Sequence, residues 1–490
     1  MKKKVLSALL SATLIVSMLA GCGGNDTPTQ GSAPATPSST PTEQTPASTP
    51  AVEDNNTAGG AMAAPATDGW DASKKIYAYS WDDDFGKKLN VVLDKYPQYK
   101  DYVEYVNLGV SGTDGTYQDA IDTALTSGDK YPSLIPADND VALWWAEDDD
   151  KTLDLGSIGL TTDMMGDAYQ FSLDYGTCNG KLKAVTWQGT PGSFTYRRDI
   201  AQEVFGVSEP ADVQALVKDW DTFFDTAAKL KEKGYYIVSG PDDIKYPVFD
   251  GQTSPWVTVK DGKEYLTLDD SVSKYLEYSK KLYDEGYTNN TTAWAGEWYA
   301  NMQGTGKVFG YFGTTWFMTQ IHNQSHEGDT PSFGQWGAVT GPCAYHWGGT
   351  YVMVGKETPN PELCAFLLYE MTCNAETMYD ITVKTGDFVN NKAANAKLVA
   401  DGDSVTLTMK DDKGNTDSMT DFLGGQNPIQ AWADTAPGIS LKNLTYQDAA
   451  IKNVIDKAAK SLWNGEYKTI DEAIAFVKTE VSTQTGLIVE

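Results

Sequence analysis

The sequence has few residues of the kinds that hold metals or act as nucleophiles, with five cysteines and three histidines among 490 residues. It contains no CxxC motif and no His/Cys cluster with zinc spacing. Basic residues are also scarce, because 38 lysines and arginines stand against 67 acids and give a formal net charge of −29. An acidic chain repels phosphates, so we expect no nucleic-acid partner. These absences predict a protein without a metal or a cofactor.

Motifs for nucleophilic catalysis and nucleotide binding fail at defined positions. The pattern GxSxG is broken after Ser111, where Gly112-Thr113 follows. GTGK resembles the end of a P-loop, but Asn301 and Val308 stand where the motif needs Gly and Ser or Thr. The sequence therefore favours a protein that is not an enzyme.

Two further candidate sites are interpreted as solvated surface. His322 and His326 are four residues apart, yet no HExxH motif surrounds them, and we interpret them as a solvated pair. The acidic stretches AEDDDKTLD and DDKGNTD lack the spacing of a calcium loop and are interpreted as turns. A glycoside hydrolase needs only two carboxylates, and among 67 acids that alternative stays open.

Only one apolar run is long, and it lies at the N-terminus. Three lysines precede the apolar residues 5–19, and Ala20-Gly21 supplies small residues, so residues 1–21 are predicted to be a secretory signal peptide. The ending LAGC resembles the lipobox of bacterial lipoproteins, in which the peptidase cuts before the cysteine. Cys22 is therefore expected to carry diacylglycerol on its sulfur, and two or three acyl chains anchor a protein stably. This places the protein on the extracytoplasmic face of a bacterial cell membrane.

The segment after the lipobox, residues 22–73, is expected to be a disordered tether. TPTQGSAPATPSSTPTEQTPASTP has almost no large apolar side chain, so it cannot bury enough surface to offset the entropy of the chain. A flexible coil of this length spans roughly 40 Å. We expect it to hold the folded part clear of the lipid headgroups.

The folded part alternates predicted strands and helices. IYAYSW, VEYVNLG, GYYIVSG, KVFGYFG, QWGAVTG and TYVMVG are typical of strands, and residues 210–234 place apolar side chains at steps of three and four, as in one amphipathic helix. Such alternation predicts an α/β fold with mainly parallel sheets. More than 400 residues favour two domains. The remaining thiols, Cys178, Cys343, Cys364 and Cys373, are expected to be mostly free and buried.

Several segments are familiar in this order along the chain. VTWQGTPGSFTYRRDIAQEVFG, DWDTFFDTAAKLKEKGYYIVSG, KLYDEGYTNNTTAWAGEWYANM, KVFGYFGTTWF, HWGGTYVMV, KTGDFVNN and FLGGQNP resemble the extracellular solute-binding proteins of family 1. These are the sugar receptors of ABC importers and are similar in architecture to maltodextrin-binding protein. The likeness runs from about residue 75 to the C-terminus.

The resemblance implies a two-lobe, type II periplasmic-binding-protein-like fold that closes at a hinge. The chain should cross between lobes at 188–192, at 348–349 and around residue 400. Lobe one would be 74–188 plus 349–400, and lobe two 193–346 plus 405–490. Pro136, in SLIPADND, is expected to interrupt its strand.

The resemblance also implies a function and nine ligand-binding residues. The protein would be a monomer that captures a carbohydrate, an oligosaccharide by preference, and delivers it to the permease subunits of an ABC importer. A surface glycoside hydrolase, or a receptor of the same fold for a non-sugar ligand, is the alternative. Aromatic rings would take the apolar faces of the sugar and polar side chains its hydroxyls. The positions are Trp81, Asp82, Asp138, Gln188, Glu297, Trp316, Trp347, Asp387 and Asn427.

Some of these residues have a second interpretation. Asp82 is also placed to cap a helix, and the two roles are compatible. Trp316 and Trp347 would otherwise belong to the core. For Trp144, Trp145 and Trp294 the sequence leaves cleft and core equally open.

Overall fold

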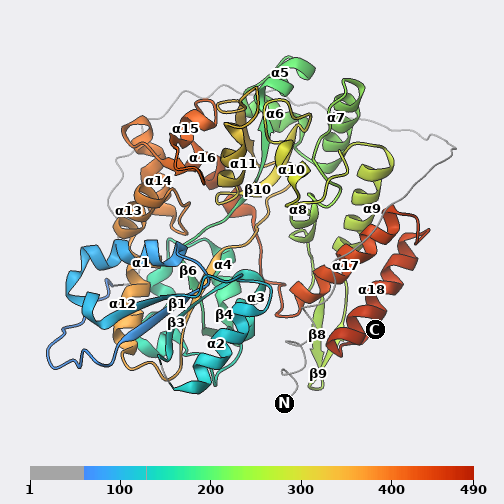
Figure 1. Ribbon diagram of the computed structural model, residues 1–490. Helices are drawn as coiled ribbons and strands as arrows, with labels where there is room; N and C mark the ends of the chain where they lie inside the picture. Colours follow the sequence, from blue (N-terminus) through green and yellow to red (C-terminus); the bar gives the residue numbers. More distant parts are fainter. Residues whose placement is uncertain (1–59, 129, 490) are drawn as a thin grey trace, which may run out of the picture.

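The computed structural model describes residues 60–128 and 130–489 (Figure 1). The predicted signal peptide, the proposed lipidation site Cys22 and most of the predicted tether lie outside these residues. Within the described part, no helix has both the length and the apolar character that crossing a membrane requires. The four cysteines of this part are free thiols, as predicted.

The first sheet is assembled from segments far apart in the chain. Its strand order is β2-β1-β3-β12-β6; β1 pairs in parallel with β2 and β3, and β12 runs antiparallel to β3 and β6. The sheet is therefore mixed. The strands are β1 (Ile76–Ser80), β2 (Val103–Asn107), β3 (Pro132–Asp138), β6 (Val185–Thr186) and β12 (Thr350–Val354).

The expected interruption at Pro136 is wrong. Strand β3 continues through Pro136, which stands opposite Val352 of β12. A proline cannot donate to the ladder, but its carbonyl still accepts, and Tyr117 donates to it from the neighbouring helix at 2.6 Å. The strand therefore carries its residues on to Asp138 at the carboxyl end of the sheet.

Helices cover both faces of this sheet. α1 packs on α12 and α13, while α2 and α3 contact β3. α12 is apolar on almost every side, and its buried residues belong to a core shared with β1 and β12. These elements are α1 (Asp84–Lys95), α2 (Thr116–Ser127), α3 (Asn139–Ala146), α4 (Gln170–Gly176), α12 (Pro361–Thr372), α13 (Ala375–Thr385), and the small hairpin β4 (Thr177–Cys178) and β5 (Lys181–Leu182).

The second sheet has the order β10-β7-β11, with both outer strands antiparallel to β7. The expectation of mainly parallel sheets is therefore wrong here. GYYIVSG forms only isolated bridges, through Tyr236 and Val238. The strands are β7 (Gly192–Arg197), β10 (Gly310–Thr314) and β11 (Trp336–Val339).

The amphipathic segment 210–234 forms two helices, where the sequence predicted one. α6 (Pro210–Leu216) ends before Asp219, whose side chain accepts from the backbone N–H of Thr222 at 2.8 Å and so starts α7 (Trp220–Glu232). Both helices still bury their apolar faces in the core of the second lobe. The apolar periodicity was informative, but the side-chain cap decided the boundary.

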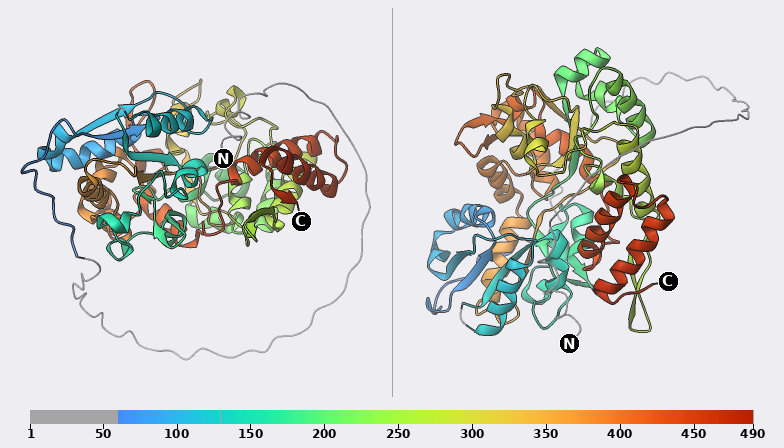
Figure 2. Two further views of the ribbon diagram at one scale, coloured as in Figure 1. Left: turned by 90° about the horizontal axis from the view of Figure 1, so that it is seen from below. Right: turned by 45° about the vertical axis from the view of Figure 1, so that its right-hand side comes forward.

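The remaining elements surround the second sheet and form its C-terminal extension. α17 packs on α9 and α18, and it also contacts α3 of the first lobe, beside which it lies in both views (Figures 1 and 2). These remaining helices and strands are α5 (Arg198–Phe205), α8 (Lys245–Phe249), β8 (Val257–Lys260), β9 (Lys263–Leu266), α9 (Asp270–Asp284), α10 (Gly296–Ala300), α11 (Met318–Ser325), α14 (Lys392–Asp401), β13 (Thr408–Lys410), β14 (Thr416–Ser418), α15 (Met419–Phe422), α16 (Pro428–Thr435), α17 (Asp448–Trp463), α18 (Ile470–Thr485) and β15 (Ile488–Val489).

The connections between the two sheets run side by side. Gln188 forms a bridge with Val389, and Pro191 forms one with His346. The segment from β6 to β7 thus pairs both with the segment that returns to β12 and with the segment after α13. α14 contacts α13 on one side and α16 on the other. A core cluster contains residues of both sheets, among them Ile135 and Trp336, so the lobes are packed together.

Candidate ligand-binding site

A cavity of 310 Å³ lies between the lobes. Its walls come from α2 and α3 of the first lobe and from α8, α17 and the turn before α17 of the second. This volume is at the lower end of the range of about 300–1,000 Å³ for small-molecule sites. The lining residues are Thr113, Gly115, Gln118, Asp119, Asp140, Val141, Trp144, Lys245, Tyr246, Tyr446, Ala449, Ala450, Lys452 and Asn453.

Three aromatic side chains contribute to the lining from both lobes. Trp144 on α3 lies 6.3 Å from Tyr446, centroid to centroid, and so brings the two lobes together at one wall. Tyr246 on α8 stacks on Trp347 at 4.3 Å with an interplanar angle of 18°. Flat rings beside hydrogen-bonding groups suit a ligand with both apolar faces and polar edges.

An ion pair crosses the cavity from one lobe to the other. Lys452 of α17 donates to Asp140 of α3 at 3.1 Å, and the two side chains are 12% and 24% exposed. Burial by itself would lower the pKa of Lys452, but the negative charges around it, with Asp140 foremost, raise it above its usual value. Burial by itself would raise the pKa of Asp140, but Lys452 brings it below its usual value. Both groups are therefore charged at neutral pH.

Other carboxyl groups near this pair lie close to neutrality. Burial, and then the charge of Asp140, raise the pKa of Asp138 to about 7. Burial also raises the pKa of Asp250 to about 7 and that of Asp448 to about 6. The interlobe region thus contains groups whose charge changes within the physiological pH range.

None of the nine predicted ligand-binding residues is among the lining residues, but three adjoin them. Trp347 contacts the cavity through Tyr246, and the Nε1 of Trp316 donates to the carbonyl of Trp347 at 3.2 Å. Asp138 accepts from the backbone N–H of Asp140 at 2.9 Å. Gly348 lies beside the side chains of Trp316 and Asp138, and its φ of +70° is one that favours glycine.

Trp81 and Asp82 lie at the end of β1, outside the lining. The ring of Trp81 packs edge-on against Tyr117 at 5.4 Å. The carboxylate of Asp82 accepts from the backbone N–H of Asp84 at 2.9 Å, at the first residue of α1. The N-cap of this helix is the next residue, Asp83, so the predicted cap is displaced by one position.

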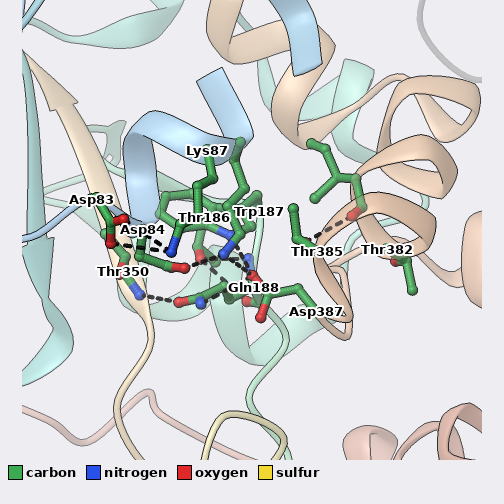
Figure 3. Close-up of polar contacts among 12 residues, drawn as sticks. Asp83, Asp84, Lys87, Thr186, Trp187, Gln188, Thr350, Thr382, Thr385 and Asp387 are labelled. Atoms are coloured by element: carbon green, nitrogen blue, oxygen red, sulfur yellow. Dashed lines mark hydrogen bonds and ion pairs between the residues drawn. The ribbon is translucent and has the colours of Figure 1, made fainter. Parts of the chain in front are cut away.

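Gln188 and Asp387 belong to a buried polar network between the segments that connect the lobes (Figure 3). Asp387 Oδ2 accepts from Lys88 at 2.8 Å, Trp187 at 3.1 Å and Gln188 at 3.3 Å. Gln188 also accepts from the backbone N–H of Thr350 at 2.9 Å. These contacts join the segment after β6 to the start of β12 and to the segment after α13, and so hold the connecting segments together.

Glu297 and Asn427 are separate from this region. Glu297 is exposed in the first turn of α10. Asn427 caps α16 by accepting from the backbone N–H of Gln430 at 3.2 Å, and it lines a second, small cavity of 40 Å³.

The sequence left the three other tryptophans open, and the structure distinguishes them. Trp144 lines the cavity, Trp145 is fully buried, and Trp294 is 46% exposed and stacks on Trp316 at 6.3 Å.

Sequence reasoning missed Tyr246, Tyr446 and Lys452. Tyr446 stands just before α17, and Asp448 and Lys452 are one helical turn apart on that helix. That spacing was the available signal for a charged face on α17.

One interpretation of the histidines is wrong. His322 is fully buried, and both it and His326 contact Asp417, which lies far along the chain. His322 is therefore not solvated, whereas His326 stays partly exposed.

Two α/β lobes around a cavity, joined by adjacent connecting segments, define the class of two-lobe binding proteins. Residues 97–406 match the family model of the bacterial extracellular solute-binding proteins, and the chain belongs to this family. The predicted family and fold are confirmed. No curated protein matches the chain in a comparison of sequences.

Solved structures of this class are similar in fold. A crystal structure of an extracellular solute-binding protein of family 1 has a TM-score of 0.67 at 15% identity, over 84% of this chain and 99% of that one. The galacto-N-biose/lacto-N-biose I-binding protein of the ABC transporter from Bifidobacterium longum has a TM-score of 0.62 at 15% identity, over 85% of this chain and 98% of that one. An ABC transporter associated binding protein from B. animalis subsp. lactis has a TM-score of 0.60 at 20% identity, over 85% of this chain and 99% of that one. At these identities the likeness shows the fold alone.

Proposed function

We propose that this protein is a lipid-anchored receptor that captures a carbohydrate, an oligosaccharide by preference, and delivers it to an ABC importer. Membership of an extracellular solute-binding family supports a role outside the cytoplasm. Two relatives in fold were solved with lacto-N-biose and with beta-1,6-galactobiose. The LAGC motif supports the anchor at Cys22.

The interlobe cavity is the observation that supports this function best. A sugar ring has apolar C–H faces and a polar rim, and the lining pairs three aromatic rings with amide, carboxylate and ammonium groups. Because the two lobes share the lining, a ligand bound there would contact both and favour their closure. The role is binding without chemical conversion.

We further propose that Trp316, Trp347 and Asp138 extend this surface. They adjoin the lining through Tyr246 and Asp140, and a rotation of the lobes would change how much of them a ligand can reach. Of the other six predicted residues, Gln188 and Asp387 join the connecting segments. Glu297 and Asn427 are separate from the cavity and are not part of this proposal.

Calorimetric titration with a panel of mono- and oligosaccharides tests the proposal. The best ligand should bind saturably at one site, and Trp144→Ala should weaken it by roughly 5- to 150-fold, since a buried aromatic contact contributes about 1–3 kcal/mol. Trp463→Ala is a matched control, because Trp463 lies at the far end of α17 and donates to Ser279. A panel without any binding sugar, or equal losses in both variants, would contradict the proposal.

A glycoside hydrolase is the second candidate. Asp138 and Asp140 have pKa values shifted in opposite directions, which is the pattern of an acid and a base in such enzymes. Incubation of the bound oligosaccharide with the protein, followed by product analysis, distinguishes the two functions. We expect the sugar to be recovered intact, and its turnover would favour the enzyme.

A further inference from the structure

A cluster of two histidines and one aspartate lies in the second lobe, away from the residues that line the interlobe cavity. His322 lies on α11, His326 caps the end of that helix, and Asp417 lies on β14 of the neighbouring hairpin. Each histidine Nε2 contacts the same carboxylate oxygen of Asp417, at 2.8 Å and 3.0 Å. The helix and the hairpin are joined at this point by ring nitrogens and a carboxylate.

The arrangement has the geometry of a metal-binding site. Histidines at positions i and i+4 present their rings on one helix face, which is a common zinc-binding spacing. Ligand atoms of the three residues lie within 4.8 Å of one another. Bonds of about 2.0–2.1 Å in a tetrahedral site place ligand atoms ~3.3 Å apart. The two contacts between histidine nitrogen and Asp417 oxygen, 2.8 Å and 3.0 Å long, would therefore lengthen by only a few tenths of an ångström to admit the ion.

The surroundings suit a cation with one position open to solvent. His322 is fully buried, whereas the side chains of His326 and Asp417 are 31% and 25% exposed, so water reaches one side of the cluster. The ring of Phe333 stacks on His326 at 4.7 Å and covers another side. A partly apolar enclosure of this kind limits the access of water to the site.

We propose that His322, His326 and Asp417 bind a divalent transition metal, with Zn²⁺ as the best match. Imidazole nitrogens with one carboxylate suit zinc, whereas Mg²⁺ and Ca²⁺ prefer sets of oxygen ligands. Three protein ligands leave the fourth position to a water molecule.

The metal would fasten the hairpin of β13 and β14 to α11. Other contacts between the hairpin and the region of α11 include the hydrogen bond from Asn323 to Asp412 at 2.9 Å and the ion pair of Lys413 with Glu327. α11 begins directly after Trp316 and Phe317, which belong to the aromatic group beside the interlobe cavity. Metal binding would therefore stabilise α11 and, through it, the position of Trp316 and Phe317 beside the interlobe cavity.

The test uses the full chain, produced without a polyhistidine tag and stripped with a chelator. Titration with ZnCl₂ should give one saturable site and a higher melting temperature, MgCl₂ should give neither, and CoCl₂ should give the visible absorption of a cobalt–imidazole site. Loss of an outer-shell partner alone typically costs about 10- to 100-fold in metal affinity, so His326→Gln and Asp417→Asn should each lose at least that much.

Asp412→Asn provides the matched control. It makes the same chemical change on the same hairpin, but Asp412 contacts Asn323 and is not a ligand. This variant should bind Zn²⁺ like the unmodified chain. Absence of a saturable zinc site, or unchanged affinity in both His326→Gln and Asp417→Asn, would overturn the proposal and leave the carbohydrate site untouched.

Discussion

Lys452→Met should destabilise the protein and loosen the contact between its lobes. The Lys452 ammonium is 3.1 Å from Asp140 in the other lobe and 5.6 Å from the ring of Tyr246. Methionine retains much of the length and apolar character of the stem but removes the charge. Asp140 would then remain in a largely buried place without its cation.

The magnitude follows from the geometry of this pair. At 3.1 Å, with an effective dielectric constant of about 20, the attraction is about 5 kcal/mol. The cost of removing both ions from water offsets part of it, and losing one partner of a buried pair typically costs about 3–5 kcal/mol. Because both side chains keep some exposure to water, we expect a loss of about 3 kcal/mol in the free energy of unfolding.

Denaturant unfolding of a double-mutant cycle measures this coupling. Asp140→Asn combined with Lys452→Met should recover most of the lost stability, because the buried charge that lost its partner is also removed. Small-angle scattering on the ligand-free single variant should show a larger radius of gyration, since one interlobe link is gone. If the two losses simply add in the double variant, the ion pair does not couple the lobes and the reasoning fails.

Three further outcomes are expected. The pKa of Asp138 in the folded protein is about 7, above its ordinary value of 3.8. The contribution of its protonated carboxyl group to the free energy of unfolding is therefore complete below about pH 4 and is lost as the pH rises to about 7. Asp138→Asn, which can still cap α3, should therefore gain stability relative to the unmodified chain as the pH rises from about 4 to about 7 in unfolding experiments; a difference that stays constant over this range would contradict the reasoning. Trp316→Ala should weaken the binding of the best sugar by roughly 5- to 150-fold in calorimetry, with little change in the melting curve. A loss of stability with intact affinity would assign Trp316 to the core. Cys22→Ser should leave a folded protein that cell fractionation recovers in the soluble fraction, whereas retention on the membrane would argue against the anchor.

Local sequence determined those features that depend on neighbours in the chain. The α/β alternation and five of the six predicted strands follow from periodicity within a few residues. The ordered likeness of whole segments also identified the family. Local patterns were insufficient for β3 and for α6 and α7. A strand neighbour stabilises β3 through Pro136, and the cap at Asp219 divides the second segment.

Tertiary structure alone decided the cavity and the histidine cluster. Asp140 and Lys452 are 312 residues apart, and His322 and Asp417 are 95 residues apart, so no periodicity connects either pair. Their contacts exist because α3 and α17 meet between the lobes, and because a hairpin packs on α11. Apolar burial determines how these surfaces meet, and it depends on the shape of the whole assembled core, which no short segment of the sequence contains.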